Sequence, residues 1–399
     1  MTSRWLTDPV ECGQRAGFGI YLHIPFCAHR CGYCDFATYD DRGHLVSRYV
    51  AALRQNVARW AEAGPRPWGG RPEAGAWGRW PRVTSVFIGG GTPTLLSAKD
   101  LTGLLAVVRE RFVLAADAEI TIEANPESVE VEALASLVSA GVNRVSIGAQ
   151  SFVPHVLATL ERRHDPERPL LAVEAARAAG VANVNMDLIY GSPGETDSDW
   201  ERTVETVVAA GTDHVSAYAL TVAANTPLAH RVAAGAVPPP DGDVQRRRFE
   251  LIRDMLASAG FDHYEVSNWA QSPARRCRHN LLYWRHGDYL GIGVGAHGHH
   301  RGRRWWSHRS IERYCAGVEA NADVVSGEES LSIAERAEER LLLGLRVVDG
   351  LHPLDLPPLR DEAVEDVLRA GLARLSRGRL QATDDGWFLL DETLSRLLV

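Results

Sequence analysis

The cysteines at positions 27, 31 and 34 are the residues whose types and spacing most clearly point to chemistry. They stand in the segment Cys27-Ala28-His29-Arg30-Cys31-Gly32-Tyr33-Cys34. Cysteine thiolates are the usual ligands of iron–sulfur clusters, and a four-iron cluster normally takes four of them. Three thiolates at this spacing can hold such a cluster and leave one iron open, as a catalytic zinc keeps one position free for its substrate. The motif therefore predicts a [4Fe-4S] cluster whose open iron binds a small molecule with amino and carboxylate groups.

A structural zinc site is the alternative for these cysteines, with His23 or His29 as the fourth ligand. Tight zinc sites usually combine two separated ligand pairs, and no second CxxC or HxxxH pair follows downstream. The chain has six cysteines in 399 residues, a usage typical of metal binding in a reducing compartment rather than of a disulfide framework. We expect Cys12 and Cys315 to be inert thiols, packed as small apolar side chains.

The residues around the motif carry a resemblance to a known superfamily. Tyr21-Leu22-His23-Ile24-Pro25-Phe26-Cys27, followed by the other two cysteines, resembles the start of radical S-adenosylmethionine proteins of the oxygen-independent coproporphyrinogen oxidase superfamily, and the likeness extends over nearly the whole chain. The oxidases carry another cysteine two residues after the third cluster cysteine, where this chain has Phe36. This departure indicates the HemW branch, whose members are regarded as haem chaperones. An oxygen-independent coproporphyrinogen III oxidase and a related radical methyltransferase are the alternative functions.

The same resemblance implies a binding site for S-adenosylmethionine. Tyr33 would face the adenine, and Tyr21 would lie beside the cluster and the cofactor. The family spacing favours Arg162 over its neighbour Arg163 as a contact. Carboxylates accept hydrogen bonds from ammonium and ribose hydroxyl groups, and a guanidinium pairs with a carboxylate, so these residue types suit the ligand. The other implied positions are Gly90, Gly91 and Thr92 at the methionine end, Glu123, Gln150, Arg162 and Asp187 around the amino acid and ribose, and Ala219 and His297.

A second motif, Cys277-Arg278-His279-Asn280-Leu281-Leu282-Tyr283-Trp284, resembles the HNxxYW motif of the haem chaperone branch. Imidazole and thiolate groups are common axial ligands of haem iron, and aromatic rings can flank the macrocycle. The haem candidates are therefore His279, Cys277, Tyr283 and Trp284. The ordinary alternative for a single histidine is a hydrogen-bonded structural residue. The nearby group His297, His299 and His300 could supply the ligand instead.

The elements that must position these residues follow from the alternation of short β-branched runs with amphipathic helical segments. Such alternation predicts parallel strands joined by right-handed crossovers. The resemblance sharpens this to an α/β fold, the incomplete (β/α)6 barrel of radical S-adenosylmethionine proteins. In such barrels the site lies at the C-terminal ends of the strands. The predicted strands are Ile20–Ile24, Ser85–Ile88, Glu119–Glu123, Arg144–Ile147, Val184–Ile189 and His214–Tyr218.

The sequence divides into three regions. Residues 1–230 form the predicted partial barrel, with a Gly-, Pro- and Trp-rich insertion near residues 64–80. Residues 231–330 begin at a proline-marked connection and form a connecting region that carries HNxxYW. Residues 331–399 predict a smaller α+β domain of winged-helix type, with a hairpin turning at Asp385-Gly386 and a closing helix.

Composition limits the function classes. A net charge of −8 and a pI near 6.0 argue against a nucleic-acid binder, for which a basic surface would be expected. No apolar run approaches the ~20 residues that span a bilayer, and residues 1–16 contain no apolar core of a signal peptide. We therefore expect a cytoplasmic protein whose partners are proteins and small molecules, and the family resemblance implies that they are haem and acceptor haemoproteins. The sequence leaves open whether it forms a homodimer or contacts a membrane through another protein.

Overall fold

The parallel strands of a large curved sheet form the centre of the molecule. The computed structural model describes residues 17–65, 79–352 and 355–398. Neighbouring strands β1 to β6 pair in parallel and in chain order, so the six predicted strands are confirmed. Their bounds are β1 Phe18–Ile24, β2 Val83–Gly90, β3 Leu114–Ala124, β4 Arg144–Gln150, β5 Asn183–Tyr190 and β6 His214–Ala219.

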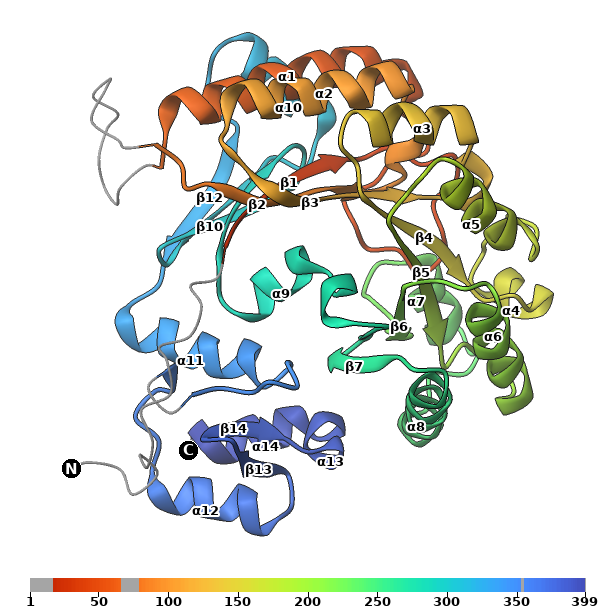
Figure 1. Cartoon of the computed structure of the whole chain (residues 1–399), viewed down its shortest axis with the longest axis vertical. Coiled ribbons are helices and arrows are strands. Elements are labelled where there is room, and N and C mark those ends of the chain that lie inside the picture. Colours follow the sequence, from red (N-terminus) through yellow and green to blue (C-terminus); the bar gives the residue numbers. More distant parts are fainter. Residues whose placement is uncertain (1–16, 66–78, 353–354, 399) are drawn as a thin grey trace.

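Helices cover the convex side of this sheet (Figure 1). Capping residues mark where two of these helices begin. Ser97 accepts a hydrogen bond from the Asp100 N–H at the start of α2, and Thr196 and Asp199 form a capping box at the start of α6. The crossovers contain α1 Val46–Ala63, α2 Ala98–Arg111, α3 Val131–Ser139, α4 Pro154–Thr159, α5 Arg168–Ala178 and α6 Asp197–Ala209, with short 3-10 turns at Gly43–Leu45, Pro93–Leu95 and Pro126–Ser128.

The region after residue 230 extends the same sheet at both of its edges. The strand order is β12-β11-β10-β9-β1-β2-β3-β4-β5-β6-β8-β7, and β9 runs parallel to β1 whereas β10, β11, β12, β8 and β7 pair antiparallel. What the sequence indicated only as a connecting region thus completes the sheet. Its elements are α7 Pro227–Ala233, α8 Gly242–Ser258, β7 Asp262–Glu265, β8 Asn268–Ala270, a 3-10 turn Pro273–Arg275, α9 Arg278–Trp284, β9 Asp288–Ile292, β10 His297–His300, β11 Arg303–Ser307, α10 Ile311–Glu319 and β12 Val325–Ser330.

The predicted insertion begins directly after α1. Residues 66–78, which include most of it, lie outside the described residues, as does Cys12. Trp80, at its end, is buried, donates its indole N–H to the Trp60 carbonyl at 2.7 Å and stacks on Phe18. This tryptophan therefore belongs to the core under the sheet. Among the described residues, no helix combines the length and apolar character needed to cross a bilayer.

The C-terminal region has a hydrophobic core of its own. The predicted hairpin at Asp385-Gly386 is wrong, because the two-residue turn is Arg377-Gly378, where both residues have positive φ. Thr383 instead accepts a hydrogen bond from the Gly386 N–H and starts a helix. The elements are α11 Ile333–Gly344, α12 Asp361–Arg369, β13 Ala373–Ser376, β14 Arg379–Ala382, α13 Asp384–Phe388 and α14 Leu390–Leu398.

Helix α9, which carries the HNxxYW residues, lies on the concave side of the sheet, opposite the covering helices (Figure 1). The buried carboxylate of Glu119, on β3, accepts the backbone N–H groups of Arg278 at 2.9 Å and His279 at 3.1 Å. A carboxylate is favourable at this end of a helix because the first N–H groups have no intrahelical acceptor. Glu119 thus anchors α9 to the barrel strands.

Replacing Glu119 by alanine should loosen this anchor. The change leaves two N–H donors at the start of α9 without their acceptor, which we expect to cost about 2–4 kcal/mol of folding free energy. Urea unfolding followed by circular dichroism would measure the lowered midpoint. Glu110→Ala removes an exposed carboxylate of α2 and is the matched control. Equal midpoints for the two variants would contradict the anchoring role.

Candidate functional site

The loop after β1 carries the three cysteines, and backbone hydrogen bonds close it on itself. The Cys27 N–H donates to the Tyr39 carbonyl at 3.0 Å, and the Tyr39 N–H donates to the Pro25 carbonyl at 2.7 Å. Cys27, Cys31 and Cys34 are free thiols of intermediate exposure. The sequence thus places all three at the C-terminal end of the first strand, as the barrel interpretation requires.

The surroundings of the thiols suit a negatively charged sulfur site. One guanidinium nitrogen of Arg162 lies 3.5 Å from Cys31 Sγ, and the Thr92 hydroxyl lies 4.0 Å from Cys27 Sγ. Burial raises the pKa of Cys27 to about 11, so this thiolate needs a cation or a bound metal for stabilisation. Within the described parts of the chain, no group of three or more His, Cys, Asp or Glu side chains is arranged to hold a metal ion. Three thiols with the Arg162 guanidinium beside them are nevertheless the donor types that an iron–sulfur cluster takes.

The glycines after β2 allow this strand to approach the cysteine loop. A Cβ atom at Gly91 would lie 2.5 Å from the Phe26 carbonyl oxygen, and one at Gly90, where φ is +119°, would lie 2.5 Å from the His23 ring. Both distances are well inside van der Waals contact. Gly90 and Gly91 therefore let the end of β2 approach β1 and the cysteine loop closely, and Thr92 follows them; their contact with the methionine end of the cofactor stays a prediction.

Two carboxyl groups lie close together inside the barrel. Glu123 accepts a hydrogen bond from the Gly90 N–H at 2.7 Å, and burial, with a contribution from Asp187, raises the pKa of Glu123 to about 7. Asp187 accepts hydrogen bonds from Ser146 at 2.8 Å and Asn185 at 2.9 Å, and burial raises its pKa as well. Both groups are oriented before any ligand binds.

Arg162 and Tyr33 both lie near Cys31. The guanidinium of Arg162 donates to the Gly148 carbonyl as well as contacting Cys31, whereas Arg163 is exposed. Arg162 is thus the arginine of the two that faces the cysteines, and its contact with S-adenosylmethionine stays a prediction. Tyr33 packs on a small apolar cluster at the ends of β5 and β6, and burial raises its pKa well above the usual value.

The remaining cofactor positions are more scattered. Gln150 ends β4 with a positive φ of 65°, and Ala219 ends β6 opposite Tyr190. The Tyr21 hydroxyl lies 3.0 Å from His23 Nδ1. His297, at the start of β10, is exposed and stacks on Trp306. The structure therefore gathers most predicted positions at one end of the barrel and leaves His297 at the surface.

Two of the haem candidates, His279 and Cys277, are buried at α9 and already have partners. Both ring nitrogens of His279 are hydrogen-bonded, Nδ1 to Ser85 at 2.9 Å and Nε2 to the Tyr283 hydroxyl at 2.9 Å. Burial lowers the pKa of His279 to about 3 and raises that of Cys277 to about 12. The imidazole is thus neutral, as an iron ligand must be, but its nitrogens are engaged. Trp284 is only partly buried.

Sequence reasoning missed a buried arginine beside these residues. Arg144 is 2% exposed, lies 3.4 Å from His214 Nδ1, and is influenced by the charges of Cys277 and Glu119. The sequence did carry a signal for the burial of Arg144, because this residue starts a strand whose alternate residues face the barrel interior. A guanidinium enclosed in this way supplies fixed positive charge at the N-terminal end of the strands.

Comparison with known proteins gives the family of this chain. Residues 21–207 match the family model for the Radical SAM superfamily, and residues 331–389 match the HemN C-terminal domain. The chain is 44% identical to the heme chaperone HemW of Mycobacterium tuberculosis over 96% of this chain and 95% of that protein. The chain belongs to the HemW family. A HemW of Bacillus subtilis is 30% identical over 95% of this chain and 98% of its own length.

The fold of HemW is shared more widely. Coproporphyrinogen III oxidase (HemN) of Escherichia coli superposes with a TM-score of 0.77 over 96% of this chain and 90% of that one, at 21% identity. A likeness at this identity concerns the fold alone. The predicted radical S-adenosylmethionine fold with a smaller C-terminal domain is thereby confirmed. Membership in the superfamily implies a [4Fe-4S] cluster and S-adenosylmethionine.

The raised pKa of Glu123 makes a pH-dependent prediction. The folded protein holds this proton more tightly than the unfolded chain, where the pKa is 4.5. The wild type should therefore lose about 2–3 kcal/mol of stability as the pH rises from about 4.5 to about 7. Glu123→Gln does not titrate, so its stability relative to the wild type should increase over this range. Urea unfolding of both proteins at several pH values measures this difference, and a difference that stays constant would contradict it.

Proposed function

We propose that this chain is a haem chaperone that binds haem and delivers it to acceptor haemoproteins in the cytoplasm. The observation that carries the proposal is the 44% identity to a heme chaperone HemW over nearly the full length of both chains. The residue at position 36 adds support. It is phenylalanine, 63% exposed, where the oxidases that this family resembles carry a further cysteine. An exposed aromatic ring cannot replace a thiolate as a ligand.

In this proposal Cys27, Cys31 and Cys34 hold a [4Fe-4S] cluster, which supplies an open iron and an electron for S-adenosylmethionine. The chain's own residues bind and orient that cofactor. Arg162 stabilises charge beside Cys31 and pairs with a carboxylate. Glu123, held by the Gly90 N–H, accepts hydrogen bonds from an ammonium group.

Haem binding is assigned to the region around the HNxxYW motif. His279 and Cys277 remain the candidate iron ligands, with Tyr283 and Trp284 as flanking rings. Because each nitrogen of His279 already has a partner, iron ligation by this side chain requires that it gives up its hydrogen bond to Ser85 or to Tyr283. Loading of haem is therefore coupled to a local rearrangement of α9.

Cysteine variants test the cluster. Cys31→Ala should reduce the iron and acid-labile sulfide of the anaerobically reconstituted protein to background, because two thiolates do not retain a four-iron cluster. Cys315→Ala is the matched control, since this buried thiol lies on α10; it should keep the full iron content. A Cys31→Ala protein with unchanged iron and sulfide, or a wild type that binds zinc instead, would overturn the assignment.

A haem titration tests the chaperone function itself. The reconstituted wild type should show a Soret band that saturates at about one haem per chain, and His279→Ala should weaken or spectrally shift it, because imidazole is a strong axial ligand. His44→Ala removes an exposed imidazole and should change nothing. A wild type without saturable haem absorption would contradict the proposal.

A further inference from the structure

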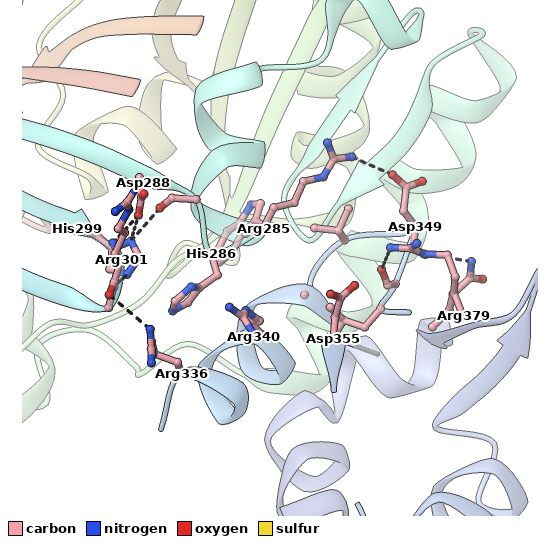
Figure 2. Close-up of a pocket in the computed structure, with 18 of the residues that line it drawn as sticks. Arg285, His286, Asp288, His299, Arg301, Arg336, Arg340, Asp349, Asp355 and Arg379 are labelled. Atoms are coloured by element: carbon pink, nitrogen blue, oxygen red, sulfur yellow. Dashed lines mark hydrogen bonds and ion pairs between the residues drawn. The ribbon is translucent and has the colours of Figure 1, made fainter. Parts of the chain in front are cut away.

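A groove separates the C-terminal domain from the segment that runs from α9 to β10 (Figure 2). Its volume is about 910 Å³, within the range of pockets that enclose small organic ligands. Trp284 to Asp288 and His299 to Gly302 form one side, and residues of α11 and of the β13–β14 hairpin form the other. None of the residues assigned to the cluster or to S-adenosylmethionine lines this groove, so it is a separate site.

The charge of the groove is opposite to that of the whole chain. Six arginines and three aspartates line it, an excess of three positive charges in a chain whose net charge is −8. Like charges that face a shared hollow repel one another, and an anion in the hollow removes this repulsion. The arginines are Arg285, Arg301, Arg336, Arg340, Arg377 and Arg379.

Some of these arginines already have acceptors, and others do not. Arg285 pairs with Asp349 at 3.1 Å, and Arg379 donates to the backbone carbonyls of Asp349 and Gly350 at 2.8 and 2.9 Å. The guanidinium groups of Arg301, Arg340 and Arg377 have no hydrogen-bond acceptor or ion-pair partner within residues 17–65, 79–352 and 355–398. Arg340 faces the groove close enough to His286 for its charge to oppose protonation of that ring.

The same groove has apolar surface beside the arginines. Trp284 and Leu351 are partly buried and Val347 is 3% exposed. Gly344 and Gly350 also line the groove; close packing requires glycine at both positions, since a Cβ at Gly344 would lie 2.4 Å from Leu351 and one at Gly350 would lie 2.2 Å from the Leu380 carbonyl oxygen. Apolar surface beside unpaired guanidinium groups suits an apolar molecule that carries carboxylates.

We propose that this groove is where the chain holds haem, with the macrocycle against Trp284, Val347 and Leu351 and the propionate carboxylates paired with Arg340 and Arg377. The proposal rests on the proposed function, because it names the place in which that haem sits. Guanidinium groups bind carboxylates through paired, charge-assisted hydrogen bonds. Both arginines belong to the C-terminal domain, which thereby becomes part of the haem site.

This placement also explains how the HNxxYW motif takes part. Of its haem candidates, Trp284 alone lines the groove, whereas His279, Cys277 and Tyr283 face the barrel interior behind it. Helix α9 thus forms a wall between the barrel and the groove. Because His279 faces away from the groove, it can ligate iron held there only after its hydrogen bond to Ser85 or to Tyr283 is released.

Titrations of the full-length reconstituted protein with three probes test the site: haem, metal-free protoporphyrin IX and protoporphyrin IX dimethyl ester. Loss of a charge-assisted carboxylate contact should raise the Kd of haem and of metal-free protoporphyrin about 10- to 100-fold in Arg340→Glu and in Arg377→Glu. The dimethyl ester has no carboxylate, so its Kd should be the same for wild type and variants. Arg340→Lys retains the charge and should recover most of the lost affinity.

Arg369→Glu makes the same charge change at an exposed position of α12 outside the groove, and its haem Kd should match the wild type. Iron content and thermal unfolding of each variant verify that it is folded and loaded. If the wild type binds haem and the Arg340→Glu/Arg377→Glu double variant binds it within about twofold, the groove is not the site and the chaperone function stands. If the wild type itself binds no haem, the proposed function fails.

Discussion

Two backbone hydrogen bonds determine where the cysteine loop lies relative to the barrel. The Gly91 N–H donates to the Ile24 carbonyl at 2.8 Å, and the Thr92 N–H donates to the Phe26 carbonyl at 2.7 Å. They extend the parallel pairing of β1 with β2 beyond the last strand residues. Because any side chain at position 91 would collide with Phe26, only glycine permits this approach. The thiols themselves make only long contacts, so the backbone, rather than the sulfur atoms, orients the loop.

The same two strands also carry the contacts of α9. On β1 the Tyr21 hydroxyl bonds to His23, whose other nitrogen lies 2.9 Å from the Ala37 carbonyl in the cysteine loop. On β2 the Phe87 ring stacks on His279 with centroids 5.2 Å apart. The cysteine loop and the HNxxYW helix, far apart in sequence, therefore share one layer of side chains inside the barrel. Under the proposed function, a shift of α9 on haem loading would disturb Tyr21, whose ring centroid lies 6.4 Å from that of His279, and hence His23.

The alternating strands and helices of the barrel could be predicted from the sequence, whereas strands β7 to β12 and the C-terminal hairpin could not. The β-branched runs correspond closely to the strands, as with Val184–Ile189 inside Asn183–Tyr190, because alternation of strands and helices has few topological solutions. Strands β7 to β12 are short and pair according to tertiary contacts, so they carry little local signal. The prediction of a hairpin turn at Asp385-Gly386 was wrong because Thr383 and the two acidic residues after it favour the start of a helix over a hairpin. Spacing located the cysteines, but only the structure shows that both nitrogens of His279 are engaged.

The arginine groove is the part of the molecule that sequence analysis was least able to find. Its walls come from segments near residues 285, 301, 340 and 377, which lie far apart in the sequence. Some of these segments are basic, since residues 289–311 contain four arginines and no acidic residue, but nothing in the sequence shows that they meet. Folding separates these charges: the Glu339 carboxylate turns to His286 and Arg304, whereas Arg340, the next residue, faces the groove. On a helix, adjacent residues point in directions about 100° apart. The same turn of α11 therefore directs the Glu339 carboxylate to His286 and Arg304 and the Arg340 guanidinium to the groove. Local positive charge can thus arise in an acidic chain when folding brings arginines from distant segments together.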